Sequence, residues 1–198
     1  MTNVWYVSYG SNISTARFDC YVRGGTPAGG RYRYGGCRDR TPPVRQRPVF
    51  IDGGIYFAKH SLTWGGGIAF LDPAVPGRVA ARAWLITLEQ FADVCAQEMR
   101  AEIGTVQVPL NELRDKGSHA YGPGHYETLL HAGDLEGRMM LTFTAPERIT
   151  PETAPTQAYV DTIADGLQET HGWSSEEARR YLDAARPHPG IAEPVQRE

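Results

Sequence analysis

The sequence predicts an α+β fold, with a single domain over residues 1–186 of the 198. Strand-like segments dominate the first 145 residues and helical patterns the last 45, which favours this class over alternating βαβ units. A Pro- and Gly-rich turn at 72–77 separates apolar segments at 67–71 and 79–86, and such a turn predicts that these two strands pair antiparallel.

The N-terminal elements follow from residue type and spacing. Residues 4–9 are aromatic and β-branched without a helical period, so they predict a buried strand. A short helix is expected over 14–22, with Ser14 as its N-cap. Residues 24–48 are rich in Gly, Pro and Arg and predict a long surface excursion with one short strand near 31–34. Further strands are expected around 48–51, 54–58, 67–71 and 79–86.

Helices become frequent after this point. The spacing of Thr87 and Gln90 is that of a capping box, which predicts a helix over 88–100. Two more strands are expected at 126–130 and 139–144, followed by helices near 156–169 and 174–185. The tail at 187–198 contains three prolines and is expected to be disordered.

Composition excludes several classes of protein. A net charge of −3 gives no overall attraction to nucleic acid or membranes, and no apolar run approaches the roughly 20 residues that span a bilayer. Three cysteines without CxxC spacing, and no visible signal peptide, indicate a cytoplasmic protein. His119, His125 and His131 recur every six residues, which fits neither a helix face nor a strand face, so no metal site is predicted. Residues 17–47 carry a net charge of +6, typical of a solvated loop or of a patch that binds anions.

The turn Tyr9-Gly10-Ser11-Asn12 lies between the first strand and the first helix. Glycine permits a tight turn and the close approach of a ligand to the backbone. Free N–H groups at a helix start can hold a carboxylate or a polarised carbonyl oxygen. The same four residues also fit an ordinary capped turn, so the turn alone does not define a site.

A carboxylate on an apolar helix face is the second candidate feature. Phe91, Val94, Cys95 and Glu98 are spaced three, four and seven apart and share one face of the predicted helix, while Asp93 is expected on the solvated side. Burial would raise the pKa of Glu98 and suit it to proton transfer near neutral pH. A position at the edge of the stripe, or an ion pair with arginine, is the alternative.

These features in this order resemble the γ-glutamyl cyclotransferase family over roughly residues 3–175. The family opens with an aromatic strand and a Tyr-Gly-Ser-Asn turn, as at 5–13 here. It continues with strand, Pro/Gly turn, strand and a helix ending in a catalytic glutamate, as from 67 to Glu98, and with a late helix like 155–166. Three departures leave the substrate open: Ala81 where the family often has Gly, Val94-Cys95 where it has Leu-Asp, and the long segment 24–48.

The resemblance implies a mixed, mostly antiparallel sheet or small barrel flanked by helices, and a reaction without cofactor or metal. The α-amino group of a γ-glutamyl amide attacks its own γ-carbonyl and releases 5-oxoproline and a free amine. Glu98 would be the general acid and base, and the N–H groups of Gly10, Ser11 and Asn12 would hold the glutamyl end. Tyr9 and Tyr126 would be wall residues whose hydroxyls orient the substrate.

Two other functions remain open from the sequence. One is hydrolysis or acyl transfer on a non-glutamyl amide in the same pocket, and the other is a module that binds a ligand without turning it over. In each case the expected partner is a small molecule, with neither a membrane nor nucleic acid. The oligomeric state is left open, a homodimer being one outcome.

Overall fold

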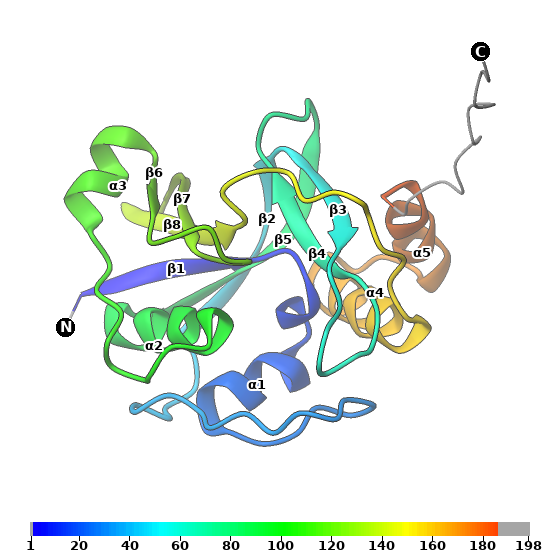
Figure 1. Ribbon diagram of the computed structural model, residues 1–198, viewed down its shortest axis with the longest axis horizontal. Coiled ribbons are helices and arrows are strands. Elements are labelled where there is room, and N and C mark those ends of the chain that lie inside the picture. The colour runs from blue at the N-terminus through cyan, green and yellow to red at the C-terminus, as the bar shows by residue number, and fades with distance from the viewer. Residues whose placement is uncertain (1, 186–198) are drawn as a thin grey trace, which may run out of the picture.

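The computed structural model describes residues 2–185 and is built around a six-stranded sheet (Figure 1). In spatial order its strands are β2 (Arg45–Asp52), β5 (Arg78–Thr87), β1 (Asn3–Ser8), β8 (Arg138–Thr144), β7 (Thr128–Leu135) and β6 (Ser118–Ala120). β1 and β8 run parallel and the other neighbours antiparallel. Within the described chain this sheet is open, with β2 and β6 at its edges. The predicted α+β class and mixed sheet are therefore confirmed, and the alternative of a closed barrel is not realised.

A separate two-stranded sheet is formed by β3 (Gly54–Ala58) and β4 (Ile68–Asp72), which pair antiparallel. The predicted pairing of 67–71 with 79–86 is therefore wrong. β5 already has β1 on one edge and β2 on the other, so no edge is left for β4. The Pro/Gly turn at 72–77 is a corner at which the chain passes from the small sheet into the large one.

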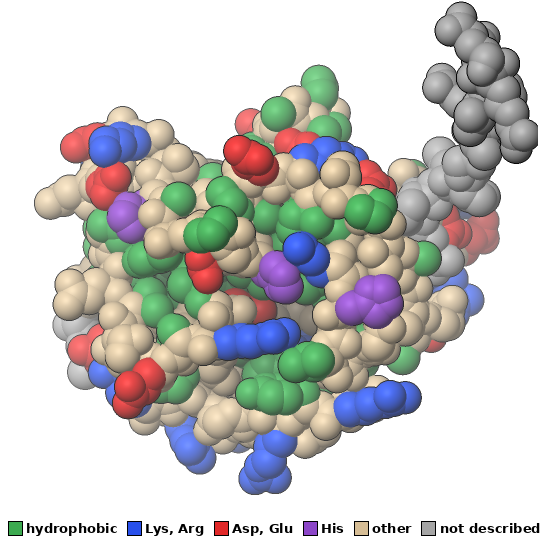
Figure 2. All heavy atoms as spheres, viewed as in Figure 1, with side chains coloured by type: hydrophobic (Ala, Val, Ile, Leu, Met, Phe, Trp, Pro, Cys, Tyr) green, Lys and Arg blue, Asp and Glu red, His purple; other side chains and the backbone are tan. Residues whose placement is uncertain are grey.

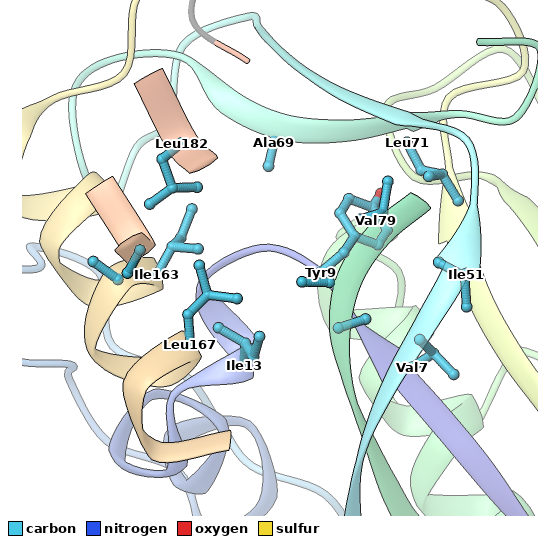
Figure 3. Close-up of a cluster of buried hydrophobic side chains, with 14 of the residues drawn as sticks. Val7, Tyr9, Ile13, Ile51, Ala69, Leu71, Val79, Ile163, Leu167 and Leu182 are labelled. Carbon is cyan, nitrogen blue, oxygen red and sulfur yellow. The ribbon is translucent and has the colours of Figure 1, made fainter. Parts of the chain in front are cut away.

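β1 is buried on both faces, which explains its continuous run of apolar residues. Trp5 and Val7 point into a core covered by α4 (Gln157–His171) and α5 (Ser175–Ala184). Val4 and Tyr6 point into the opposite core, with α1 (Thr15–Arg23) and α2 (Leu88–Met99). Figure 3 shows the first core, in which Ile163 and Leu167 of α4 lie beside Ile13.

The predicted helix starts are largely confirmed. Thr87 caps α2 through its hydroxyl, which accepts from the Gln90 N–H at 3.1 Å, while the Gln90 side chain accepts from the Thr87 N–H at 3.0 Å. α5 begins with an equivalent pair, Ser174 and Glu177. Ser14 holds the N-cap position of α1, but its hydroxyl caps no N–H group of that helix.

Several local predictions differ from the structure. No strand covers 31–34; the only ladder contact there is a single bridge between Tyr34 and Gly25, because the segment packs beneath α1 (Figure 1). The short helix α3 (Leu110–Lys116) and β6 were not predicted, since the residues before them show no clear period. The three cysteines are free thiols. The tail at 187–198 lies outside the described residues, and within 2–185 no helix has the length and apolar character needed to cross a membrane.

Gly166 generates a test of how α4 packs against the N-terminal turn. A Cβ at this position would lie 2.5 Å from both the Ile13 side chain and the Ser14 backbone nitrogen. Alanine normally favours a helix over glycine by roughly 1 kcal/mol, but overpacking costs roughly 1–3 kcal/mol. We expect Gly166→Ala to lower the free energy of unfolding in urea, with an unchanged m-value. The neighbouring exposed change Asp165→Ala is the control and should not destabilise; equal effects of the two would contradict the packing argument.

Candidate active site

The Tyr9–Asn12 turn leads from the end of β1 into a three-residue 3₁₀ helix, η1 (Ser11–Ile13). Gly10 has φ −100°, so it is not required for a left-handed conformation. Its role is close packing, because a Cβ there would lie 3.1 Å from the Tyr159 hydroxyl and 3.5 Å from the Ala69 side chain. Glycine therefore allows the turn to approach α4 and β4.

The N-terminus of α1 does not serve as the anion site that the sequence suggested. The backbone N–H and hydroxyl of Thr15 both donate to the Glu169 carboxylate, at 3.0 and 2.6 Å. The same carboxylate oxygen accepts from Arg82 at 2.9 Å. The positive end of α1 is thus neutralised by a residue of α4, and what the turn presents to a ligand is the short segment before α1.

Glu98 lies at the end of the apolar stripe of α2, as its spacing predicted. Phe91, Val94 and Cys95 are fully buried, and Glu98, one turn further on, is partly buried. Asp93 was expected in solvent but is buried, because the segment after α1 folds over it and Arg38 pairs with it at 3.0 Å. Of the two acids, only Glu98 faces the cavity described next.

A cavity of about 430 Å³ brings all the predicted site residues together, and its size is that of a small-molecule site. Its walls include every residue predicted for the site: Tyr9, Gly10, Ser11, Asn12, Glu98 and Tyr126. Figure 2 shows the molecule hollowed on this face, with basic and histidine side chains around the opening.

Asn12 links the turn to the glutamate. Its side-chain amide donates to a Glu98 carboxylate oxygen at 3.3 Å and to the Tyr6 hydroxyl at 3.1 Å. The side-chain oxygen of Asn12 is buried and accepts no hydrogen bond. The turn therefore orients the carboxylate as well as lining the cavity.

The pKa of Glu98 is raised above the usual value for glutamate, chiefly by burial away from water. Hydrogen bonding from Tyr21, the positive charge of Arg17 and the Asn12 amide each favour the carboxylate, but together they do not cancel the effect of burial. A carboxyl group with a raised pKa in a cavity is suited to accept and return a proton.

The two predicted tyrosines form walls, but their hydroxyl protons are not free. Tyr9 donates to the Phe143 carbonyl and Tyr126 to the Ala69 carbonyl, each at 2.7 Å. The Tyr126 ring stacks on Phe70, with ring centroids 4.8 Å apart. These tyrosines can offer a ligand an aromatic face and an oxygen lone pair, and the predicted role of their hydroxyls in orienting a substrate stays a prediction.

Sequence reasoning missed the Arg/Tyr side of the cavity. Arg17 and Tyr21 of α1 and Tyr34 of the following segment all line it. Arg17 donates to the Tyr34 hydroxyl at 2.7 Å and to the Tyr21 hydroxyl at 3.3 Å. The alternation of arginine with tyrosine between 17 and 47 was a signal for this wall, but composition alone cannot distinguish it from a solvated loop.

The three evenly spaced histidines lie apart. His119 contacts Glu112 at 2.9 Å, His131 contacts Asp134 at 3.2 Å, and His125 lines the cavity. Within residues 2–185 no group of three or more His, Cys, Asp or Glu side chains is arranged to hold a metal ion.

Comparison with known proteins supports the fold more strongly than the function. The chain is 32% identical over 206 residues to histone deacetylase 5 of Arabidopsis thaliana; the match covers 94% of this chain but only 31% of the plant protein. The chain thus spans about a third of that relative's length. No family model matches the sequence.

Three solved structures share the fold. A γ-glutamyl cyclotransferase superposes with a TM-score of 0.53 at 15% identity, covering 97% of this chain and 93% of that one. An uncharacterized protein from Homo sapiens gives a TM-score of 0.53 at 15% identity, covering 98% and 94%. YkqA from Bacillus subtilis gives a TM-score of 0.50 at 16% identity, covering 95% and 57%. The chain therefore has the γ-glutamyl cyclotransferase fold.

The electrostatics of Glu98 predict a pH-dependent effect on stability. The folded state raises the pKa of Glu98. Ionisation of this group therefore lowers the free energy of unfolding as the pH rises through the folded pKa. The effect is absent below the unfolded pKa, which is about 4.3. We expect Glu98→Gln to be more stable than the wild type at pH 8 and equally stable near pH 4, measured by urea unfolding. Exposed Glu102→Gln is the control. A Glu98→Gln protein less stable than the wild type at pH 8 would contradict the burial argument.

Proposed function

We propose that this protein is a γ-glutamyl cyclotransferase-type enzyme that converts a γ-glutamyl amide into 5-oxoproline and a free amine. The observation that carries the proposal is the contact of Glu98 with Asn12 across one wall of the cavity. The raised pKa of Glu98 and the fold shared with a solved γ-glutamyl cyclotransferase support it.

In the proposed reaction Glu98 acts first as a base and then as an acid. Its carboxylate takes a proton from the α-ammonium group, and the freed amine attacks the γ-carbonyl carbon of the same glutamyl unit. A C–N bond forms, closing the five-membered ring, and the tetrahedral intermediate carries a negative oxygen. Glu98 then gives this proton to the leaving nitrogen, the original amide C–N bond breaks, and the carbonyl re-forms. The ring nitrogen still carries a second proton and a positive charge; the regenerated Glu98 carboxylate takes this proton and passes it to the released amine, which leaves as an ammonium ion. No atom is gained or lost by the protein.

The cavity contributes orientation. An attack within one molecule gains most of its rate from holding the amine over the carbonyl, for which effective molarities of roughly 10⁵ M or more are known. The walls formed by Tyr9, Tyr126 and the Gly10 turn restrict a substrate to a folded conformation in a space of about 430 Å³. One carboxylate that moves a proton from one nitrogen to the other completes the requirements.

The first test is a panel of γ-glutamyl amides with different leaving amines, assayed for 5-oxoproline. We expect at least one member to be turned over, and Glu98→Gln to lower kcat by roughly 10²–10⁴, the usual contribution of a general acid–base group. Glu102→Gln is the matched control, because Glu102 is exposed and lies just beyond α2. Undiminished release of 5-oxoproline by Glu98→Gln would rule out this mechanism.

The same assay separates the alternative functions. Hydrolysis or acyl transfer on another amide predicts Glu98-dependent loss of substrate without 5-oxoproline, and the name of the plant relative, a deacetylase, makes acylated amines a suitable addition to the panel. A binding module predicts retention of a ligand without turnover in either protein.

A second test concerns pH. Because Glu98 must be deprotonated to act as a base and its pKa is raised by burial, kcat/KM should fall on the acid side with an apparent pKa above that of an ordinary glutamate. The pH profile is measured with a substrate whose only titratable groups are its α-carboxylate and α-amine. A fall in kcat/KM centred at about pH 4 would show that the base used in the reaction is not a buried carboxylate.

A further inference from the structure

Arg17 is a buried cation without an anionic partner. Its side chain is 3% exposed, and no Asp or Glu within residues 2–185 comes within ion-pair distance of it. The Nε and Nη1 atoms are buried without any hydrogen-bond acceptor. An unpaired charge in the interior of a protein costs several kcal/mol, so this arrangement calls for an explanation.

The groups that do contact Arg17 are neutral. Nη2 donates to the hydroxyls of Tyr34 and Tyr21, and the guanidinium carbon lies 4.2 and 4.5 Å from the centroids of the same two rings. The Tyr34 hydroxyl is fixed in turn by Thr63 at 2.9 Å. The two tyrosines hold the guanidinium in place without pairing its charge, and the Glu98 carboxylate acts on it only through space.

Arg17 lines the same cavity as Glu98 and Asn12. Asn12 has the complementary defect, a buried side-chain oxygen that accepts no hydrogen bond. Two residues that line the cavity thus hold unpaired polar atoms, donors at Arg17 and an acceptor at Asn12, and the Asn12 side chain contacts the Glu98 carboxylate. An amino acid unit, with a carboxylate and an ammonium on one carbon, matches this pattern.

We propose that Arg17 binds the carboxylate of an α-amino acid unit, so that the α-ammonium of the same unit lies against Asn12 and Glu98. This inference rests on the proposed function and assigns the charge that the cavity recognises: the α-carboxylate of the γ-glutamyl group. With the carboxylate held at Arg17, the α-amine is directed to Glu98, which takes its proton. Arg17 is then a binding residue at the opposite end of the unit from the bond that breaks.

The test uses two ligands that differ only in the carboxylate, 5-oxoproline and pyrrolidin-2-one, titrated into the wild type by calorimetry. We expect the wild type to bind 5-oxoproline about ten- to a hundred-fold more tightly, the range for a charge-assisted hydrogen bond. Arg17→Gln should abolish this preference while leaving pyrrolidin-2-one unaffected, and Arg17→Lys should retain part of it. Exposed Arg33→Gln, on the segment that follows α1, is the matched control for loss of one positive charge.

The same variants distinguish a binding role from a structural one. A structural arginine would, when replaced, weaken both ligands equally or lower the melting temperature as well, whereas a carboxylate-binding arginine affects only the charged ligand. Equal affinity of Arg17→Gln and the wild type for 5-oxoproline, a parallel loss of both ligands, or no preference of the wild type for the carboxylate would overturn the proposal.

Turnover separates this proposal from the proposed function. Release of 5-oxoproline from γ-glutamyl amides with the same KM in Arg17→Gln would overturn the role of Arg17 and leave the cyclotransferase function standing. Absence of 5-oxoproline release from every amide, together with Arg17-dependent binding of 5-oxoproline, would overturn the function and leave the carboxylate site standing.

Discussion

The hydrogen bond between the Asn12 amide and the Glu98 carboxylate joins the two halves of the site across 86 residues of sequence. It requires β1 to end where it does, and it requires α2 to point its last turn at the same place. β1 is fixed because it is buried between β5 and β8 and between two cores. α2 is fixed by the capping box at its start and by its apolar stripe against Tyr6 and its neighbours. The site therefore depends on the packing of the central strand.

Burial has opposite consequences for the two charges in the cavity. It raises the pKa of Glu98, which favours the neutral acid, whereas the guanidinium of Arg17 stays charged without an ion-pair partner in contact with it. Each charge partly stabilises the other at a distance, without direct contact. Both buried charges lower the stability of the folded protein. Destabilising groups of this kind are typical of functional sites. Elsewhere the buried charges are paired in the ordinary way, Asp93 with Arg38 and Arg82 with Glu169.

The sequence predicted the parts of the fold that depend on local pattern. The β1 run, the α2 capping box and the inward position of Glu98 follow from residue type and spacing, and all three are present. The pairing of β4 was wrong, because a Pro/Gly turn has the same composition whether it closes a hairpin or turns a corner between sheets. Asp93 was misplaced because a helix covered on a second side by a loop has no solvated face there. Arg17 could not be identified, since its neighbours Tyr34 and Thr63 come from segments that meet α1 only in the folded chain.

The cavity is lined partly by regular elements of the fold and partly by irregular segments. A γ-glutamyl cyclotransferase shares the fold over 97% of this chain at 15% identity, so the fold tolerates almost complete change of sequence. The sheet, the Gly10 turn and α2 with Glu98 form one part of the cavity wall. The opposite wall comes from irregular segments, with Tyr32 and Tyr34 before β2 and His60 and Trp64 between β3 and β4. Loops of this kind can change without disturbing the core. These two segments are therefore the part of the cavity wall that can vary without change of fold, and fold similarity alone does not transfer a substrate from one such protein to another.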